Sequence, residues 1–96
     1  MSKQPAIYIL TSQMKTVLYI GVTSQLVPRI WLHKNDVASG FSQKYQVHNL
    51  VHYELFDTMY AAIEREKQLK KWRRLWKEQL ITENNPQWLD LYDTLL

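Results

Sequence analysis

The sequence contains no cysteine, only two glycines and three prolines, and no long hydrophobic run. Without cysteine, neither disulfide bonds nor thiolate metal sites can form, which excludes the class of small disulfide-stapled secreted proteins. No segment approaches the roughly 20 apolar residues of a membrane span, and the polar residues 1–5 are unlike the start of a signal peptide. We therefore expect a cytoplasmic protein that does not enter a membrane.

Positive charge, by contrast, is concentrated in one stretch. The chain has 96 residues and a net charge of +3, and seven of its twelve Lys and Arg lie in residues 65–77. We call these seven the basic ridge: Arg65, Lys67, Lys70, Lys71, Arg73, Arg74 and Lys77. Such a ridge favours contact with DNA phosphates regardless of base sequence, although a solvated helix face explains it equally well.

Two short apolar runs, Ala6–Leu10 and Leu18–Val22, are rich in Ile, Val and Tyr, as buried strands are. The polar segment Thr11–Thr16 between them is short. The two runs are therefore predicted to pair as an antiparallel hairpin with a loop of about five residues. This pairing would bring Tyr8 and Tyr19 close together.

A helix is predicted over Gln25–Asp36, after a Thr-Ser pair that can cap it and with Pro28 in its first turn. Arg29 and His33 are four residues apart, so they project side by side along one edge of this helix. The apolar stripe beside them consists of Leu26, Ile30 and Val37. The next stretch, residues 38–45, is predicted to be a loop that contacts substrate.

The second half of the chain is predicted to be mainly helical. Leu50–Phe56 is a third strand candidate. Asp57-Thr58 is predicted to cap a helical segment over Thr58–Thr82. This segment is too long for one ordinary helix, so a break is expected near residues 72–74. The apolar face of this segment consists of Ala62, Ile63, Leu69, Trp72, Trp76 and Leu80. Residues 87–95 form a last helical turn whose core contacts are Trp88, Leu89 and Leu91.

Three strands, several helices and no repeated β-α-β unit predict the fold class. We expect one domain over residues 1–96, an α/β protein of the α+β type. Its small, three-stranded, mainly antiparallel sheet would be flanked by helices.

Glu66 is the best candidate metal ligand in the sequence. On a helix it lies within about 60° of three apolar residues, whereas Glu64 points the other way. A carboxylate on an apolar face is costly unless it is paired or bound to a cation. One carboxylate completed by water and phosphate oxygens suits Mg²⁺ or Mn²⁺; a salt bridge to a basic neighbour is the alternative. Zinc is disfavoured, because no metal-motif spacing relates His33, His48 and His52.

Several short motifs of this chain occur in the same order as the motifs of a known nuclease superfamily. They are Ile7-Tyr8, Tyr19-Ile20-Gly21, Arg29, His33, a Glu within residues 62–68, and Asn85-Pro86. On this set the chain resembles the GIY-YIG nuclease superfamily from Ile7 to about Tyr92. It is most similar to small stand-alone bacterial members related to the excinuclease C subunit, which cuts damaged DNA. One departure is Ala6, where the family usually has Gly; Ala is tolerated in a strand with negative φ.

The resemblance implies a GIY-YIG-like fold and catalytic roles for Tyr8, Tyr19, Arg29, His33, Glu66 and Asn85. Arg29 would contact the scissile phosphate, and His33 would orient a phenol or pass a proton. Either tyrosine could be the general base or position water, although a phenol with a pKa of about 10 needs a nearby metal or cation. Taken singly, each has an ordinary explanation: a core tyrosine, a surface arginine, a hydrogen-bonded histidine, or an asparagine that caps a helix.

The leading hypothesis is a metal-dependent DNA endonuclease acting on branched, damaged or distorted DNA, as in DNA repair, which the resemblance implies. A separate recognition domain has no room here, so we expect low specificity or a partner protein that delivers the domain to DNA. The alternatives are a non-cleaving nucleic-acid-binding module and a protein-interaction domain. Base stacking by Trp72 or Trp76 is a further alternative, but helical spacing makes core packing the first expectation.

Overall fold

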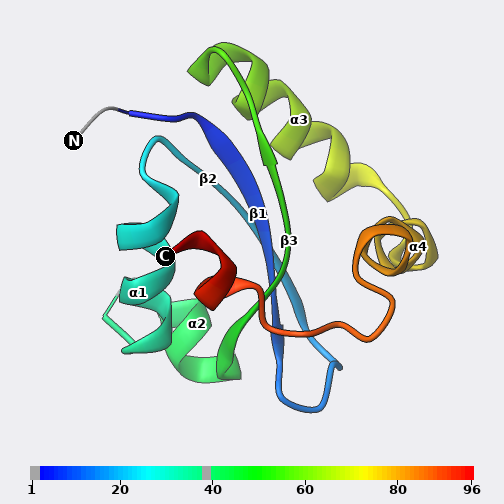
Figure 1. The fold of residues 1–96 in the computed structure, drawn as a ribbon. Coiled ribbons are helices and arrows are strands. Elements are labelled where there is room, and N and C mark those ends of the chain that lie inside the picture. Colours follow the sequence, from blue (N-terminus) through cyan, green and yellow to red (C-terminus); the bar gives the residue numbers. More distant parts are fainter. Residues whose placement is uncertain (1–2, 38–39) are drawn as a thin grey trace.

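The computed structural model describes residues 3–37 and 40–96 (Figure 1). Its elements, in chain order, are β1 (Ala6–Ser12), β2 (Leu18–Thr23), α1 (Leu26–Lys34), α2 (Gly40–Tyr45), β3 (Val47–Leu55), α3 (Met59–Lys71), α4 (Arg74–Asn84) and the 3₁₀ helix η1 (Tyr92–Leu95). Within these described ranges, no helix is both long and apolar enough to cross a membrane. The predicted fold class is confirmed.

The strands form one antiparallel sheet in the order β2-β1-β3. β1 lies in the centre and is buried along its whole length. Its register places Tyr8 opposite Gly21 of β2 and Tyr53 of β3. The predicted hairpin is confirmed, since residues 13–17 join β1 to β2. β3 begins earlier than predicted, at Val47.

Helices cover both faces of the sheet (Figure 1). α1, α2 and η1 lie on one side, and α3 and α4 lie on the other. Successive strand side chains alternate between faces, so β1 supplies both cores. Tyr8 and Leu10 pack with α1, whereas Ile7 and Ile9 pack with α3 and α4. We call the two sides the α1 face and the α3 face.

Local signals set the helix boundaries. Pro28 is the third residue of α1, where a helix leaves its N–H groups unpaired. Thr58 caps α3, because its Oγ1 accepts a hydrogen bond from the Ala61 N–H at 3.1 Å. Trp72 and Arg73 are both extended and separate α3 from α4, so the predicted break is confirmed.

Two predictions about the region after α1 are wrong. Residues 40–45 form helix α2 rather than a loop, while Ala38 and Ser39 lie outside the described residues. Val37, predicted to share the inward stripe of α1, is 63% exposed. The helix ends at Lys34, so its period no longer determines where Val37 points.

Three apolar side chains of the second half are more exposed than predicted: Ile63 (36%), Trp76 (46%) and Leu89 (59%). The extended junction restarts the helical phase, so Trp76 does not continue the buried face of α3. On α3, the side chain of Ala62 is buried and that of the neighbouring Ile63 is not. Trp88 has a φ of 55°, which turns the chain just before Leu89. Trp88 and Leu91 pack on the cores as predicted.

Candidate active site

Three aromatic rings meet on the α1 face of the sheet. The ring centroids of Tyr8 and Tyr19 are 6.3 Å apart, and that of His33 lies 5.6 Å from Tyr8 and 5.3 Å from Tyr19. The antiparallel register brings the two tyrosines together, and α1 places the fully buried His33 against them. We call these three residues and Arg29 the tyrosine cluster.

A chain of hydrogen bonds links Tyr8 to both predicted residues of α1. The Tyr8 hydroxyl lies 3.0 Å from Nε2 of His33, and Nε of Arg29 donates to the Tyr8 oxygen at 3.4 Å. A guanidinium can only donate, so the Tyr8 oxygen accepts from Arg29 and can donate its own proton to His33. Nδ1 of His33 then carries the imidazole proton, and this buried atom has no partner among the described residues.

Burial controls the charge of the tyrosine cluster. It raises the pKa of Tyr8 to about 12, against the opposing hydrogen bond from Arg29. Burial and the positive charge of Arg29 lower the pKa of His33 to about 4. The hydrogen bond to Tyr8 raises the pKa of Arg29 above its ordinary value. At neutral pH the phenol and the imidazole are therefore both uncharged beside a charged guanidinium.

The low pKa of His33 makes stability depend on pH. The unfolded chain binds a proton there at the ordinary pKa of 6.5, whereas the folded chain excludes it down to about 4. We expect the free energy of unfolding to decrease as the pH falls from 6.5 towards 4, by about 3 kcal/mol in full. Denaturant titrations at several pH values should show this slope for the wild-type chain and a flatter one for His33→Gln.

Glu54 titrates in a different window and so does not obscure this effect. Burial raises its pKa, but hydrogen bonds from His52 and Arg65 outweigh burial and lower it from 4.5 to about 2. Its contribution to stability is present above pH 4.5 and is lost as the pH falls from 4.5 to about 2. An undiminished slope between pH 6.5 and 4.5 in His33→Gln would therefore contradict the assignment to His33.

Gly21, the last residue of the Tyr19-Ile20-Gly21 motif, leaves space for the Tyr8 ring. A Cβ atom built on Gly21 would lie 2.3 Å from both Cζ and Oη of Tyr8 and 2.8 Å from Cε2. Real Cβ atoms do not approach other atoms within 3.0 Å, so a side chain here would displace the phenol. The φ of Gly21 is not positive. Glycine is therefore required here because the Tyr8 ring lies so close to its backbone, and not because of the backbone conformation. Sequence reasoning identified the motif but not this reason.

Glu66 lies on α3, which packs on the opposite face of the sheet, against β2 and β1. Its side chain is 16% exposed and forms an ion pair with Nζ of Lys70 at 3.4 Å. Glu64 is exposed, as its helical angle predicts. The tyrosine cluster brings four of the predicted residues together. The expectation that Glu66 meets them in one cleft is wrong in this structure, because α3 packs on the opposite face of the sheet from the two phenols. A metal-binding role for Glu66 stays a prediction.

Asn85 ends α4 and is 5% exposed. Its amide nitrogen donates to the carbonyls of Val51 at 3.1 Å and Leu89 at 2.8 Å, and its Oδ1 accepts from the Leu89 N–H at 3.0 Å. These bonds join the end of α4 to β3 and to the C-terminal segment. The structure gives Asn85 this structural role, and a catalytic role stays a prediction.

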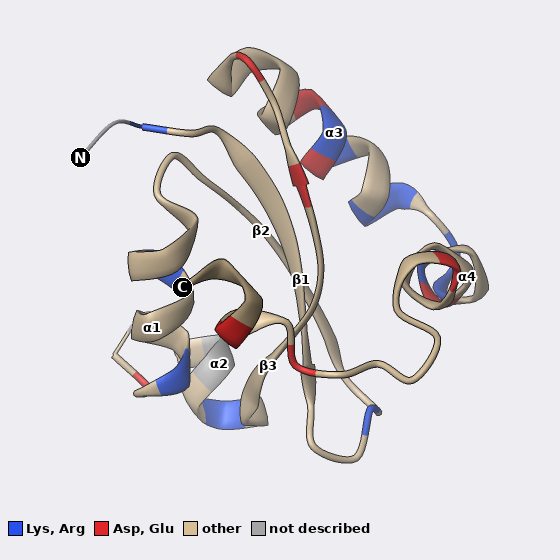
Figure 2. Cartoon of the chain, in the orientation of Figure 1, with Lys and Arg blue, Asp and Glu red and all other residues tan. Residues whose placement is uncertain are grey.

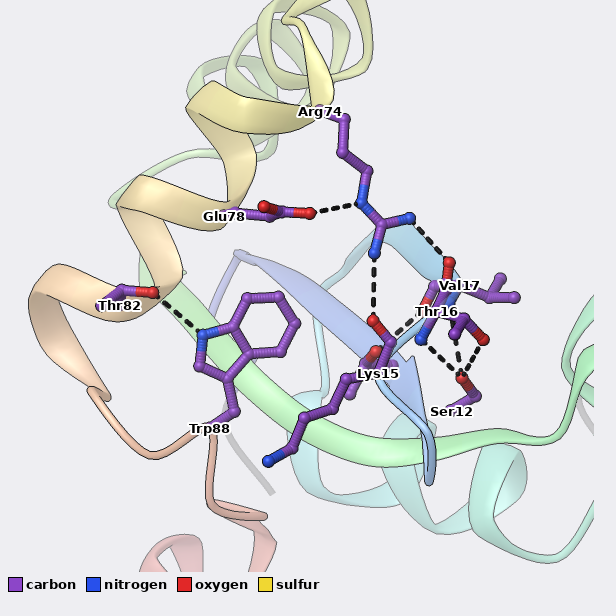
Figure 3. A network of polar contacts seen from close by, with 9 residues as sticks. Ser12, Lys15, Thr16, Val17, Arg74, Glu78, Thr82 and Trp88 are labelled. Atoms are coloured by element: carbon purple, nitrogen blue, oxygen red, sulfur yellow. Dashed lines mark hydrogen bonds and ion pairs between the residues drawn. The ribbon is translucent and has the colours of Figure 1, made fainter.

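Arg74, one residue of the basic ridge, holds the β1–β2 loop against α4 (Figure 3). Its two terminal nitrogens donate to the carbonyls of Thr16 and Lys15 at 2.7 and 3.1 Å. Its Nε pairs with Glu78 at 2.8 Å. These contacts engage the guanidinium within the fold, so Arg74 is less available to phosphates than the sequence suggests.

Two further ridge residues have partners within the protein. Arg65 donates to Glu54 at 2.9 and 3.2 Å, and Lys70 pairs with Glu66. The other members come from the second half of α3, the junction and α4, and Figure 2 shows Lys and Arg on both helices. Three of these members are exposed and the last is half-buried: Lys67, Lys71, Arg73 and Lys77. The surface that can meet phosphates is therefore smaller than the whole ridge.

Sequence reasoning missed an ion-pair network between β3 and α3. Glu54 accepts a hydrogen bond from His52 at 2.8 Å as well as those from Arg65. Arg65 directly precedes Glu66, so the network anchors α3 beside the candidate metal ligand. The sequence did contain one signal: His52 and Glu54 are two residues apart on a predicted strand, so their side chains point to the same face. It contained no signal for Arg65, which comes from a different element.

Comparison with known protein families agrees with this geometry. The family described as the GIY-YIG catalytic domain matches residues 4–79, a range that contains the tyrosine cluster and Glu66 but not Asn85. The chain belongs to the GIY-YIG family. The resemblance inferred from the sequence is confirmed, and membership of this family implies nuclease activity with DNA as substrate.

Similar GIY-YIG proteins carry the name UPF0213 protein. One from Haloquadratum walsbyi is 35% identical over 66 residues, which cover 69% of this chain and 74% of the relative. Another, from Syntrophus aciditrophicus, is 34% identical over 79 residues, covering 81% and 90%. A third, from Staphylococcus saprophyticus, is 33% identical over 66 residues, covering 69% and 80%. No solved structure matches the chain significantly.

Proposed function

We propose that this chain is a divalent-metal-dependent DNA endonuclease of the cytoplasm, acting on branched, damaged or distorted DNA as in DNA repair. The observation that carries the proposal is the hydrogen-bond chain from Arg29 through the Tyr8 hydroxyl to His33, with Tyr19 alongside. Phosphodiester hydrolysis requires a group that takes a proton from water and positive charge that stabilises the phosphate. The tyrosine cluster contains groups of both kinds.

Proton movement within the cluster depends on what binds beside it. In the free protein the pKa of Tyr8 is about 12 and that of His33 about 4, so the proton stays on Tyr8. A phosphate beside the cluster raises the pKa of the imidazole, and added positive charge lowers that of the phenol. Tyr8 then passes its proton to His33 and accepts one from the attacking water. Tyr19, whose ring lies beside that of Tyr8, would position this water or act as the base itself.

Arg29 supplies fixed positive charge at the same place. A guanidinium has five N–H donors in a planar fork, and Tyr8 accepts from one of them. The other donors suit phosphate oxygens, where a planar fork stabilises developing charge better than a lysine ammonium does. The bond to Tyr8 also sets the direction of the guanidinium.

Glu66 is the residue that would hold the divalent cation, Mg²⁺ or Mn²⁺. GIY-YIG nucleases generally use divalent metals, and the described part of the chain contains no group of three or more acidic or histidine side chains that could bind one. A site at Glu66 would therefore consist of one carboxylate completed by water and phosphate oxygens, ligands that Mg²⁺ accepts. The ion pair of Glu66 with the exposed Lys70 is long, at 3.4 Å, and can yield to a cation. When bound, the cation stabilises charge on the phosphate and acidifies water.

Contacts with the rest of the DNA are assigned to the accessible part of the basic ridge. Lys67, Lys71 and Arg73 are exposed, and Lys77 is half-buried. Phosphate contacts of this kind position a protein on DNA but carry no sequence information. Specificity would then come from DNA shape or from a partner protein that delivers the chain to its substrate.

Cleavage assays test the proposed function. Supercoiled plasmid and synthetic duplexes that are intact, nicked or branched are incubated with Mg²⁺, Mn²⁺ or EDTA. We expect cleavage with either cation, none with EDTA, and a large loss of rate in Tyr8→Phe, which keeps the ring but removes the hydroxyl. A folded protein that binds every substrate and cleaves none would favour the non-cleaving module instead.

A further inference from the structure

A cavity of about 210 Å³ lies beside the α3–α4 junction, against α4. Its lining consists of Trp72, Trp76, Gln79, Leu80 and Glu83. Trp72 belongs to the extended junction, and the other four lie on α4 at helical spacing, so they form one stripe along that helix. The proposed cleavage chemistry uses none of these side chains.

Two tryptophans form the aromatic wall of this cavity. Their rings meet edge to face, with centroids 6.1 Å apart and an interplanar angle of 85°. Cζ of Arg65 lies 5.1 Å from the ring centroid of Trp72, and that of Arg73 lies 5.5 Å from the centroid of Trp76. Trp76 is nevertheless 46% exposed. An indole held in place by a second ring and a guanidinium is a preorganised surface on which another flat group can stack.

The size and polarity of the cavity fit a single planar heterocycle. Its volume is below the roughly 300 Å³ at which sites for drug-sized ligands begin. Gln79 and Glu83 supply an amide and a carboxylate, the groups that hydrogen-bond the edges of bases.

The charge around the cavity favours a nucleotide over a protein partner. Lys71 directly precedes Trp72 and Lys77 directly follows Trp76, while Arg73 lies over the exposed ring. Protein interfaces have cores depleted of charged residues, whereas a stacking surface beside cations is the usual arrangement for unpaired nucleic acid.

We propose that this cavity holds one unstacked nucleobase of the DNA substrate. The base stacks on Trp76, its polar edge contacts Gln79 and Glu83, and its phosphate lies near Arg73. A carboxylate accepts from exocyclic amino groups, so cytosine and adenine are preferred to thymine. This site, which rests on the proposed action on DNA, specifies the substrate class as duplexes that contain an unpaired or extruded base.

Three hairpin duplexes of one sequence test the site. One is fully paired, one carries a single bulged cytosine, and one has an abasic residue in place of that cytosine. Fluorescence anisotropy is measured in EDTA, where metal-dependent cleavage cannot occur. We expect the wild-type chain to bind the bulged cytosine about tenfold more tightly than the other two. Trp76→Ala should lose this preference and Trp76→Phe should keep most of it.

Leu75→Ala is the matched control, because Leu75 is an apolar neighbour on the same helix that is 59% exposed and does not line the cavity. It should bind all three duplexes as the wild-type chain does. Equal affinity of the wild-type chain for the three, or a preference retained in Trp76→Ala, would overturn the nucleobase site. Equal affinity is the result expected if the cavity serves a protein partner, and a retained preference would mean that the bulge is bound elsewhere on the protein.

Failure of the cleavage proposal has a different signature. In that case the bulge preference persists in EDTA while no substrate is cut with Mg²⁺ or Mn²⁺. Cleavage without a bulge preference would instead remove the nucleobase site and leave the endonuclease in place. Thermal melting of each variant shows that the comparison is made between folded proteins.

Discussion

Glu66→Gln is expected to abolish metal-dependent cleavage while leaving DNA affinity within a few-fold of wild type. The substitution keeps the shape of the side chain but removes the negative charge that would hold a divalent cation. We expect a cleavage rate below about one hundredth of the wild-type rate, the scale on which one electrostatic contact to a transition state acts. Affinity should be maintained, because the change releases Lys70 from its ion pair and removes no cation from the basic ridge. Initial nicking rates and anisotropy titrations measure the two effects separately.

Glu64→Gln is the matched control for this prediction. The two acids are two residues apart on α3, about 200° apart around the helix, and Glu64 is exposed whereas Glu66 is half-buried. The control removes the same charge from the same helix and should cleave at nearly the wild-type rate. Cleavage that persists in Glu66→Gln and disappears in Glu64→Gln would show that the wrong acid has been assigned.

Gly21→Ala is expected to destabilise the protein by about 3 kcal/mol, the upper end of the usual cost of overpacking a core, and to reduce cleavage strongly. The new Cβ would lie 2.3 Å from Cζ and Oη of Tyr8. Tyr8 is 1% exposed and cannot swing into solvent. The phenol must therefore leave its position beside His33 and Arg29, or the strands must separate. Denaturant titrations measure the loss of stability, and nicking rates measure the loss of activity.

Two further variants separate the clash from a general effect of removing glycine. Gly40→Ala should change stability by less than about 0.5 kcal/mol, because a Cβ at Gly40 would have no neighbour within 4 Å among the residues that the structure describes. Tyr8→Leu lacks Cζ and Oη, so adding Gly21→Ala to it should cost much less than in the wild-type background. Additive costs in the double variant would rule out the ring of Tyr8 as the source of the clash.

The predictions that succeeded rest on local signals. Arg29 and His33 are neighbours on α1 because four residues make about one helical turn. Thr58 caps α3 because a hydroxyl at that position reaches an unpaired N–H. The two tyrosines meet because a short polar loop leaves an antiparallel hairpin as the simplest pairing.

Two of the predictions that failed carried a helical period past the end of a helix. Val37 follows the end of α1, and Trp76 follows the extended junction between α3 and α4, so neither keeps the phase of the preceding helix. Where a helix ends depends on capping and on tertiary contacts, which often override local propensity. The exposure of Trp76 that results is what makes a stacking site available.

The sequence by itself determined the hairpin, the break between α3 and α4, and the pairing of Arg29 with His33, because each depends on spacing within a short stretch of the chain. The family resemblance supplied the full set of residues in the tyrosine cluster. Only the tertiary structure decided that the Tyr8 ring needs the space above Gly21, and that Arg74 is engaged by the β1–β2 loop. Burial then set the pKa values of Tyr8 and His33. Close packing and desolvation join residues that are far apart along the chain, and no local pattern records which of them will meet.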